Sequence, residues 1–253
     1  MIKFIINADD YGISTQASEA IASLFERQLI SRTTMVVNYV ENNEFSISIA
    51  IKYNFIDFVG LHINIYDGKP LTDTIKGCPD FVTNGVFNHR YRSSFKRFII
   101  FNKKTKEALI QEIDAQFKLF KRLTRDHCSF HFDSHHHIHT DPSIWKIIKK
   151  VAKKNGFKST RISQNIFSKA YRRNVLKMIY KTFFNKSIKH HFISTDYFCS
   201  ACDFLSQKKM KKIDDCVVEI MCHPVFTSNK CFINELEFDA INKINKMANW
   251  HIL

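Results

Sequence analysis

Histidine and aspartate side chains are concentrated at a few points of this sequence, in combinations that bind metal ions. The segment 133–139 reads DSHHHIH, so four histidines fall within five positions after Asp133. Two adjacent aspartates, Asp9 and Asp10, follow a short apolar run near the amino terminus. Imidazoles together with carboxylates suit divalent metals, so both segments are candidate ligand sites. The ordinary alternatives are a surface histidine cluster and an aspartate that caps the following helix.

Three more polar residues stand out by their neighbours in the sequence. His62 follows a glycine and a leucine, His223 lies in the sequence MCHP, and Arg161 follows a basic stretch. The proline after His223 favours an extended backbone at that histidine and ends the strand there. Taken singly, the three residues are also typical of a histidine satisfied at a strand end, a turn histidine and a surface cation.

The geometry of the histidine-rich segment depends on the backbone that carries it. If the preceding strand continues, His135, His137 and His139 lie on one side of it. If the chain turns helical after Asp133, His135 and His139 share a face instead. In either case Asp133 can orient a ligand histidine from behind.

The combination of residue types predicts hydrolysis of an amide or an ester. One carboxylate and two imidazoles around a metal leave positions open for water and substrate. A divalent metal lowers the pKa of bound water and polarises a carbonyl oxygen. A second carboxylate then serves as general base, and a histidine protonates the leaving amine.

The secondary structure that must position these groups is predicted from the apolar pattern. Helical spacing is found at 14–28, 106–123, 143–154 and 234–250. Short β-like runs are found at 2–7, 33–38, 129–133, 159–163 and 217–221 and within 57–65, and residues 66–104 have the Gly and Pro content of a long irregular excursion. Strands that alternate with helices predict a parallel sheet.

Each group of candidate residues follows the carboxyl end of an expected strand. In a barrel of parallel strands these ends converge on one face, where active sites are built. The chain of 253 residues is 45% hydrophobic, which suits one such unit. We therefore expect an α/β fold, a distorted (β/α) barrel-like single domain over residues 1–253, with the active site at the C-terminal strand ends.

Four motifs in family order give a specific resemblance. They are NADDYG (7–12), GLH (60–62), DSHHHIH (133–139) and EIMCHP (219–224), and they extend over about residues 1–226. On these motifs the sequence resembles the YdjC-like carbohydrate deacetylases, the group that includes the ChbG and HpnK proteins. The resemblance implies a distorted barrel-like fold and removal of acetyl groups from N-acetylated sugars.

The resemblance also implies roles by motif position. One divalent ion, Mg²⁺ or Zn²⁺, is expected on Asp10, His62 and His135. Asp9 is expected as base and His223 as acid, with Arg161 steadying Asp9; these roles rest partly on analogy with the NodB-type polysaccharide deacetylases. Further substrate-binding or supporting positions are His139, Asp133, His137 and Asp196.

Basic residues are distributed unevenly along the chain. The net charge is +14, and residues 142–195 hold fourteen Lys or Arg and no Asp or Glu. We expect a basic amphipathic insertion at about 164–192, with Lys and Arg interleaved among apolar residues at helical spacing. Its place before an Asp-aromatic-Phe motif is similar to the HpnK-type branch, which is associated with lipid-linked sugars. A core-packing helix with a solvated outer face is the alternative to a helix on an anionic membrane surface.

The expected partner is thus an N-acetylated sugar, lipid-linked or otherwise anionic, with an anionic membrane surface as a second candidate. The amino terminus lacks a secretory leader pattern, so a cytoplasmic protein is expected, peripheral at the inner membrane face if the basic segment binds lipid. No RNA-binding signature is recognised, so nucleic acid is not an expected partner. The competing functions are a metal-dependent phosphoesterase on an α/β barrel and a non-catalytic basic membrane-binding protein. The sugar, the metal and the oligomeric state stay open.

Overall fold

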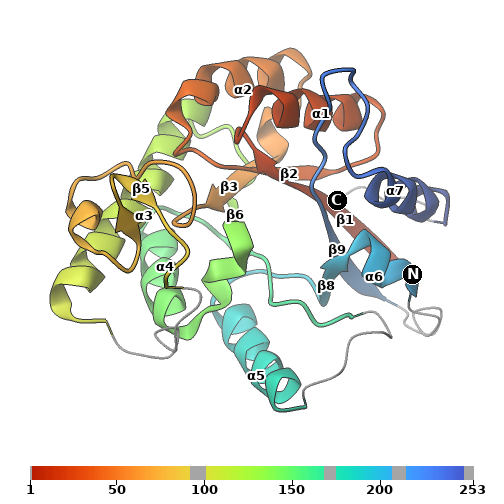
Figure 1. Cartoon of the computed structure of the whole chain (residues 1–253). Coiled ribbons are helices and arrows are strands. Elements are labelled where there is room, and N and C mark those ends of the chain that lie inside the picture. The colour runs from red at the N-terminus through yellow and green to blue at the C-terminus, as the bar shows by residue number, and fades with distance from the viewer. Residues whose placement is uncertain (1, 92–100, 168–174, 207–214, 248–253) are drawn as a thin grey trace.

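A parallel sheet of seven strands forms the centre of the molecule, in the order β7-β6-β3-β2-β1-β9-β8 (Figure 1). The computed structural model describes residues 2–91, 101–167, 175–206 and 215–247. Every strand pair in this sheet is parallel. The strands are β1 (Ile2–Tyr11), β2 (Arg32–Met35), β3 (Val59–Ile63), β6 (His131–Ser134), β7 (Ser159–Thr160), β8 (Tyr197–Ser200) and β9 (Cys216–Cys222).

The sheet curls into a half-barrel, because one segment reaches both of its edges. Ile193 forms a parallel bridge with Ser159 of β7, and its carbonyl accepts a hydrogen bond from Thr160 N (3.0 Å). Four residues later the same segment becomes β8, which pairs with β9 at the other edge. The expected distorted barrel-like α/β domain is confirmed.

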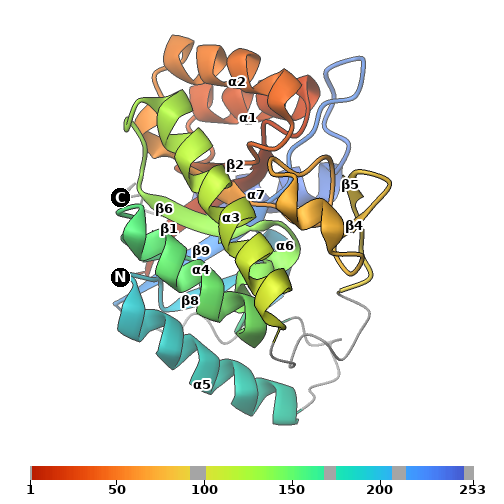
Figure 2. The same cartoon turned by 90° about the vertical axis from the view of Figure 1, so that its left-hand side faces the viewer.

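Helices surround the sheet, and α3, α4 and α5 lie side by side over one part of it (Figure 2). No helix of the described ranges is both long and apolar enough to cross a membrane. The α-helices are α1 (Thr15–Glu26), α2 (Val40–Lys52), α3 (Lys103–Thr124), α4 (Pro142–Lys154), α5 (Val175–His191), α6 (Ala201–Ser206) and α7 (Glu235–Met247). Within the described ranges there are also three 3₁₀ segments, η1 (Ile56–Phe58), η2 (Thr74–Gly77) and η4 (His135–Thr140), and a two-stranded antiparallel sheet of β4 (Val82–Thr83) and β5 (Val86–Phe87).

The predicted helices at 14–28 and 106–123 are confirmed, and capping side chains set where each begins. Ser14 accepts a hydrogen bond from Ala17 N (3.1 Å), so the N-cap of α1 is this serine and not one of the aspartates. Asn102 accepts a hydrogen bond from Thr105 N (2.8 Å), which lets α3 begin three residues before the apolar pattern. The long helix ends at Thr124, and the next residue, Arg125, has a left-handed backbone (φ 51°).

Helix α2 is not predicted by the apolar pattern of the sequence. Its apolar residues Phe45, Ile47, Ile49 and Ile51 alternate as they would in a strand. The residues it buries are Asn43, Ser46 and Ala50, which recur at helical spacing but are small or polar. The apolar pattern was therefore misleading because this helix packs through its small side chains.

The excursion between β3 and α3 is held by two buried polar residues of α3. Glu112 accepts hydrogen bonds from the backbone N–H groups of Leu71 (3.1 Å) and Thr72 (2.9 Å). Gln116 accepts a hydrogen bond from Asn64 N (3.0 Å) and donates one to Asn64 O (2.7 Å). The first part of the excursion is thus fixed against the helical layer although it has no regular structure.

Candidate active site at the carboxyl ends of the strands

The residues that the sequence singled out for chemistry converge at one edge of the sheet. Asp9 and Asp10 lie near the end of β1, and His62 is the fourth residue of β3. Asp133 lies in β6, Arg161 follows β7 directly, and His223 follows β9 directly. Because all these strands run parallel, their carboxyl ends share one side of the half-barrel.

A β-bulge re-aims the two adjacent aspartates. Ala8 pairs with Thr33 and Tyr11 with Met35, so β1 holds one residue more than β2 between these pairs. Asp10 takes up the extra residue with a left-handed backbone (φ 66°), which aspartate tolerates better than most residues. On a regular strand the two side chains would point to opposite faces; with the bulge, both reach the cluster described below.

Asp10, His62 and His135 form a cluster with the composition of a metal site. Asp10 Oδ1 lies 3.2 Å from His62 Nε2 and 2.8 Å from His135 Nδ1. One possible ligand atom from each residue lies within 4.8 Å of the others. Although burial opposes it, hydrogen bonds from His135 and His62 hold the pKa of Asp10 well below its ordinary value. A carboxylate and two imidazoles facing one point are suited to a divalent metal.

The contacts of the other ring nitrogen of His62, Nδ1, also support a metal site. His62 Nδ1 lies 2.6 Å from Asp133 Oδ1, and Thr34 Oγ1 donates to Asp133 Oδ2 (3.1 Å). A histidine that binds metal through one ring nitrogen commonly donates its other N–H to a carboxylate in this way. Burial opposes a charged ring here, but Asp133 and Asp10 raise the pKa of His62 to about 10. The site therefore favours a positive charge at this point, which a cation or a proton can supply.

Arg161 is fully buried and contacts three carboxylates. Its two terminal nitrogens donate to Asp9 Oδ2 and Oδ1 (both 2.6 Å), and its Nε donates to Glu219 Oε1 (2.7 Å). The same guanidinium lies 2.9 Å from Asp133 Oδ2 and over the ring of Phe198 at 4.6 Å. Burial works against ionisation, but Arg161 holds the pKa of Asp9 well below its ordinary value. Asp9 is thus a fixed group beside the Asp10 cluster, and Arg161 favours its ionised form.

His223 is more exposed than Asp9 beside it, with 43% of its side chain accessible against 2% for Asp9. Its Nε2 lies 3.9 Å from Asp9 Oδ2, and its Nδ1 lies 3.6 Å from Glu237 Oε1 of α7. Glu237 also accepts a hydrogen bond from the backbone N–H of His223 (2.7 Å). Although burial opposes it, Glu237 and the charges of Asp9 and Asp10 raise the pKa of His223 to about 9. The imidazole is therefore protonated at neutral pH and can give up a proton.

The histidine-rich segment follows neither of the two backbone alternatives. The strand ends at Ser134, and η4 follows with left-handed backbones at His136 (φ 53°) and His137 (φ 57°). His139 is buried, with Nδ1 2.6 Å from Ser134 Oγ and Nε2 3.1 Å from Arg161 O. Burial lowers the pKa of His139 to about 4, so this ring is neutral. Both of its nitrogens therefore contact protein groups, Ser134 Oγ and Arg161 O.

Of the remaining expected positions, His137 lies near Arg161 and Asp9, and Asp196 lies at the opposite end of the sheet. Burial and the charge of Arg161 hold the pKa of His137 well below its ordinary value, and its ring contacts Phe198. Asp196 contributes its backbone N–H to Val217 O (2.9 Å) and accepts from Val217 N (3.0 Å). Val217 lies at the start of β9, so the structure does not bring Asp196 to the cluster.

Four residues that contact the site have no role predicted from the sequence. Glu219 sits inside the apolar run VVEIM, and a buried charge there was the available signal. Thr34 is buried in β2 and touches both His62 and Asp133. Asp67 and Glu237 come from the excursion and from α7, and nothing in the local sequence indicated that they reach this place.

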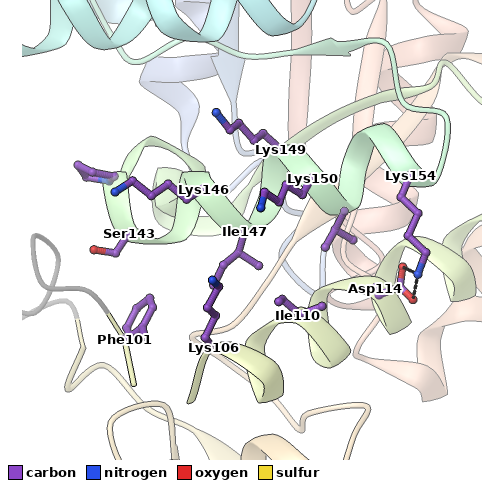
Figure 3. Close-up of a pocket in the computed structure, with 12 residues that line it drawn as sticks. Phe101, Lys106, Ile110, Asp114, Ser143, Lys146, Ile147, Lys149, Lys150 and Lys154 are labelled. Carbon is purple, nitrogen blue, oxygen red and sulfur yellow. Dashed lines mark hydrogen bonds and ion pairs between the residues drawn. The ribbon is translucent and has the colours of Figure 1, made fainter. Parts of the chain in front are cut away.

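A separate groove of about 750 Å³ lies between α3 and α4 (Figure 3). Its floor is apolar, and lysines of both helices stand around it; Lys154 is paired with Asp114. None of the residues discussed above for the strand-end site lines it. The lining residues are Phe101, Lys106, Ile110, Asp114, Pro142, Ser143, Lys146, Ile147, Lys149, Lys150, Val151 and Lys154.

Known proteins of one family are similar to this chain over most of its length. Residues 3–250 match the family described as YdjC-like protein. A carbohydrate deacetylase of Clostridium beijerinckii is 26% identical, with 100% of this chain and 94% of that protein covered. A carbohydrate deacetylase of Halalkalibacterium halodurans is 27% identical, with 89% and 86% covered. A crystal structure of a candidate cellobiose-phosphate cleavage protein of Enterococcus faecalis has the same fold, with a TM-score of 0.70, 20% identity, and 95% and 94% of the chains covered.

Proposed function

The chain belongs to the YdjC-like protein family, and we propose that it is a metal-dependent hydrolase that removes the N-acetyl group from an N-acetylated sugar. One observation carries the proposal. The cluster of Asp10, His62 and His135 lies beside an ionised Asp9 and a protonated His223, in a chain similar over its length to carbohydrate deacetylases. Metal-dependent amide hydrolysis combines these three functions: a metal site, a base and an acid.

The metal site would consist of Asp10, His62 and His135 and would hold one divalent ion. When bound, the ion lowers the pKa of a water molecule and polarises the acetyl carbonyl. Asp133 holds the ring of His62 from behind at 2.6 Å. The two imidazoles suit Zn²⁺ and the carboxylate suits Mg²⁺ or Zn²⁺, so adding back each metal to stripped protein identifies the ion.

Asp9 would accept the proton of the attacking water. Its two oxygens are held by the guanidinium of Arg161, which fixes the plane of the carboxylate and keeps it ionised. A carboxylate that stays ionised is available as a base at any physiological pH. Arg161 would act through Asp9 as a positioning residue.

His223 would protonate the nitrogen of the leaving amine. With a pKa raised to about 9, the imidazole carries its proton at neutral pH, and Glu237 fixes the backbone of the residue. Its Nε2 faces Asp9 across 3.9 Å, so acid and base stand on the same side of the cluster. The side chain is partly exposed, which leaves room for a sugar amide to approach.

The finer part of the proposal concerns the binding partner, which would be an anionic membrane surface or an anionic, lipid-linked sugar. Helix α5 buries Phe184 and Ile188 against the core but leaves Ile179, Tyr180 and Phe183 outside. It lies beside the lysine-rich helix α4, where Lys149 Nζ contacts His191 Nε2 (3.1 Å). Exposed apolar residues flanked by lysines are typical of helices that lie on acidic membranes. Residues 168–174 of the expected basic helix lie outside the described residues.

Sedimentation with lipid vesicles tests this finer part. Lys181 is unsuitable as a charge probe because it donates to Gln164 O (3.1 Å), so the apolar residues are changed instead. Phe183→Ser with Ile179→Ser should lose binding to anionic vesicles at low salt. Ile51→Ser, a comparably exposed isoleucine of α2, is the matched control and should bind as the wild type does. Equal binding to neutral and anionic vesicles would leave α5 as a core-packing helix only.

Acetate release tests the reaction itself. The protein is stripped of metal, reloaded with Mg²⁺ or Zn²⁺, and offered free, phosphorylated, nucleotide-linked and lipid-linked N-acetyl sugars. Release of acetate from at least one class, dependent on metal, is the expected result. Release of phosphate from phosphorylated sugars without acetate, with two or more metal ions bound, would favour a phosphoesterase.

A further inference from the structure

Asp67, which belongs to none of the sequence motifs, places its carboxylate beside His135, on the side of the ring away from Asp10. Asp67 Oδ2 lies 3.1 Å from His135 Nε2, while the other ring nitrogen, Nδ1, faces Asp10 Oδ1 at 2.8 Å. The imidazole is thus held between two carboxylates. Only Asp10 of these belongs to the cluster that the sequence predicted.

The same arrangement is found at the other imidazole of the cluster. His62 presents Nε2 to Asp10 (3.2 Å) and Nδ1 to Asp133 (2.6 Å). His135 uses its nitrogens the other way round, with Nδ1 toward Asp10 and Nε2 toward Asp67. Each of the two imidazoles therefore has its own carboxylate on the side away from Asp10.

We propose that Asp67 is a positioning residue for His135, the counterpart of what Asp133 is for His62. The inference rests on the proposed metal-dependent function and names a further residue of that site. When Nε2–H donates to Asp67, the ring holds the tautomer whose lone pair is on Nδ1 and points toward Asp10. A carboxylate in this position fixes the ring orientation and makes the imidazole a better ligand.

Asp67 can do this because its backbone is anchored to buried residues. Its carbonyl accepts hydrogen bonds from Asn38 Nδ2 and Asn64 Nδ2 (both 2.9 Å), and its N–H donates to Asn64 Oδ1 (3.1 Å). Asn38 follows β2 and Asn64 follows β3 directly, and both are buried. Gln116 of α3 holds the backbone of Asn64. The carboxylate is therefore placed by the sheet and the helical layer, not by a free loop.

A second cation between Asp67, His135 and His136 is the competing interpretation of this geometry. It would require His135 to give both ring nitrogens to metals and to lose both N–H protons. His136 Nε2 is also the more distant group, at 3.8 Å from Asp67 Oδ2, and the other oxygen of Asp67 is taken by His89 Nε2 at 3.0 Å. A hydrogen bond donated by His135 Nε2–H to Asp67 Oδ2 accounts for the same short distance, and the ring then keeps one N–H proton.

The experiment measures Zn²⁺ binding without substrate, by competition with a chromophoric chelator. Asp67→Asn removes the charge with little change in shape, and Asp67→Glu restores a carboxylate. Asp73→Asn is the matched control, because it removes one charge from the same excursion at a side chain that is 92% exposed. Thermal unfolding in excess chelator shows whether each variant folds, and the visible spectrum of the Co²⁺-loaded protein reports the ligand field.

We expect one Zn²⁺ per wild-type chain. Asp67→Asn should bind one equivalent with a Kd raised about 10–100-fold, with a shifted Co²⁺ spectrum and unchanged unfolding in chelator. Asp67→Glu should recover part of the affinity, and Asp73→Asn should match the wild type.

An unchanged Kd in Asp67→Asn would overturn the inference, as would two equivalents in the wild type and one in the variant. A wild type that binds metal but releases no acetate would refute the proposed reaction alone.

Discussion

Replacing Arg161 by methionine should destabilise the fold strongly, because the guanidinium neutralises three buried carboxylates. Asp133 would retain His62 at 2.6 Å, and Glu219 would retain Arg32 at 3.0 Å. Asp9 would lose both of its short contacts to a cation and keep the amide of Asn7 at 2.8 Å and His223 at 3.9 Å. The change therefore leaves one buried carboxylate largely uncompensated.

The expected loss of unfolding free energy is that of one broken buried ion pair, about 3–5 kcal/mol. This is a large share of the roughly 5–15 kcal/mol that stabilise an ordinary domain. Equilibrium urea unfolding at pH 7.5 in the presence of chelator measures it without a contribution from metal binding. The double variant Asp9→Asn/Arg161→Met should recover much of the loss, since it removes the uncompensated charge.

The loss should also depend on pH in a definite direction. In the wild type the pKa of Asp9 is lower in the folded than in the unfolded state, so its contribution is present above about pH 4 and declines as the pH falls. In Arg161→Met, burial without the guanidinium should raise the folded pKa of Asp9, and acid should relieve the penalty. The difference between the two proteins should therefore shrink from pH 7.5 toward pH 4. A loss below 1 kcal/mol, or one that is the same at both pH values, would refute this account of Arg161.

Three further outcomes are expected. Asp9→Asn should bind metal with wild-type stoichiometry but release acetate about 10²–10⁴-fold more slowly, and a near-normal rate would exclude Asp9 as the base. Because the acid has to be protonated, kcat/KM should fall as the pH rises through about 9, the pKa of His223, and Glu237→Gln should move that decline to lower pH in a pH–rate profile. His139→Ala should lower the melting temperature in chelator while a metal titration still finds one equivalent, since both ring nitrogens of His139 contact protein; loss of the metal at full stability would make it a ligand.

The location of the site could be predicted from the sequence because it depends on a general property of parallel sheets. Apolar runs that end in Asp10, His62 and Asp133 predict strands, and the carboxyl ends of parallel strands meet. Arg161 and His223 were expected at the same edge on this ground, and the structure brings them there. The expectation required only the order of the elements and no knowledge of the loops.

The features that the sequence did not predict depend on contacts between distant segments, or on a β-bulge and left-handed backbone conformations. The bulge at Asp10 and the left-handed residues after His135 break the regular alternation of side-chain directions along a strand. Asp67 and Glu237 reach the site from the excursion and from α7, where the local sequence shows nothing unusual. Asp196 lies at the opposite end of β9 because its strand begins there.

Metal-dependent deacetylation is tested most directly by one titration. Metal-stripped protein is given increasing amounts of the activating divalent ion, and bound metal and acetate release are measured on the same samples with an N-acetylated sugar that the wild type accepts. Acetate release should rise in proportion to bound metal and level off at one equivalent per chain, and His62→Ala should show neither. Full acetate release by stripped protein, or by a His62→Ala protein without metal, would contradict the assignment of the site.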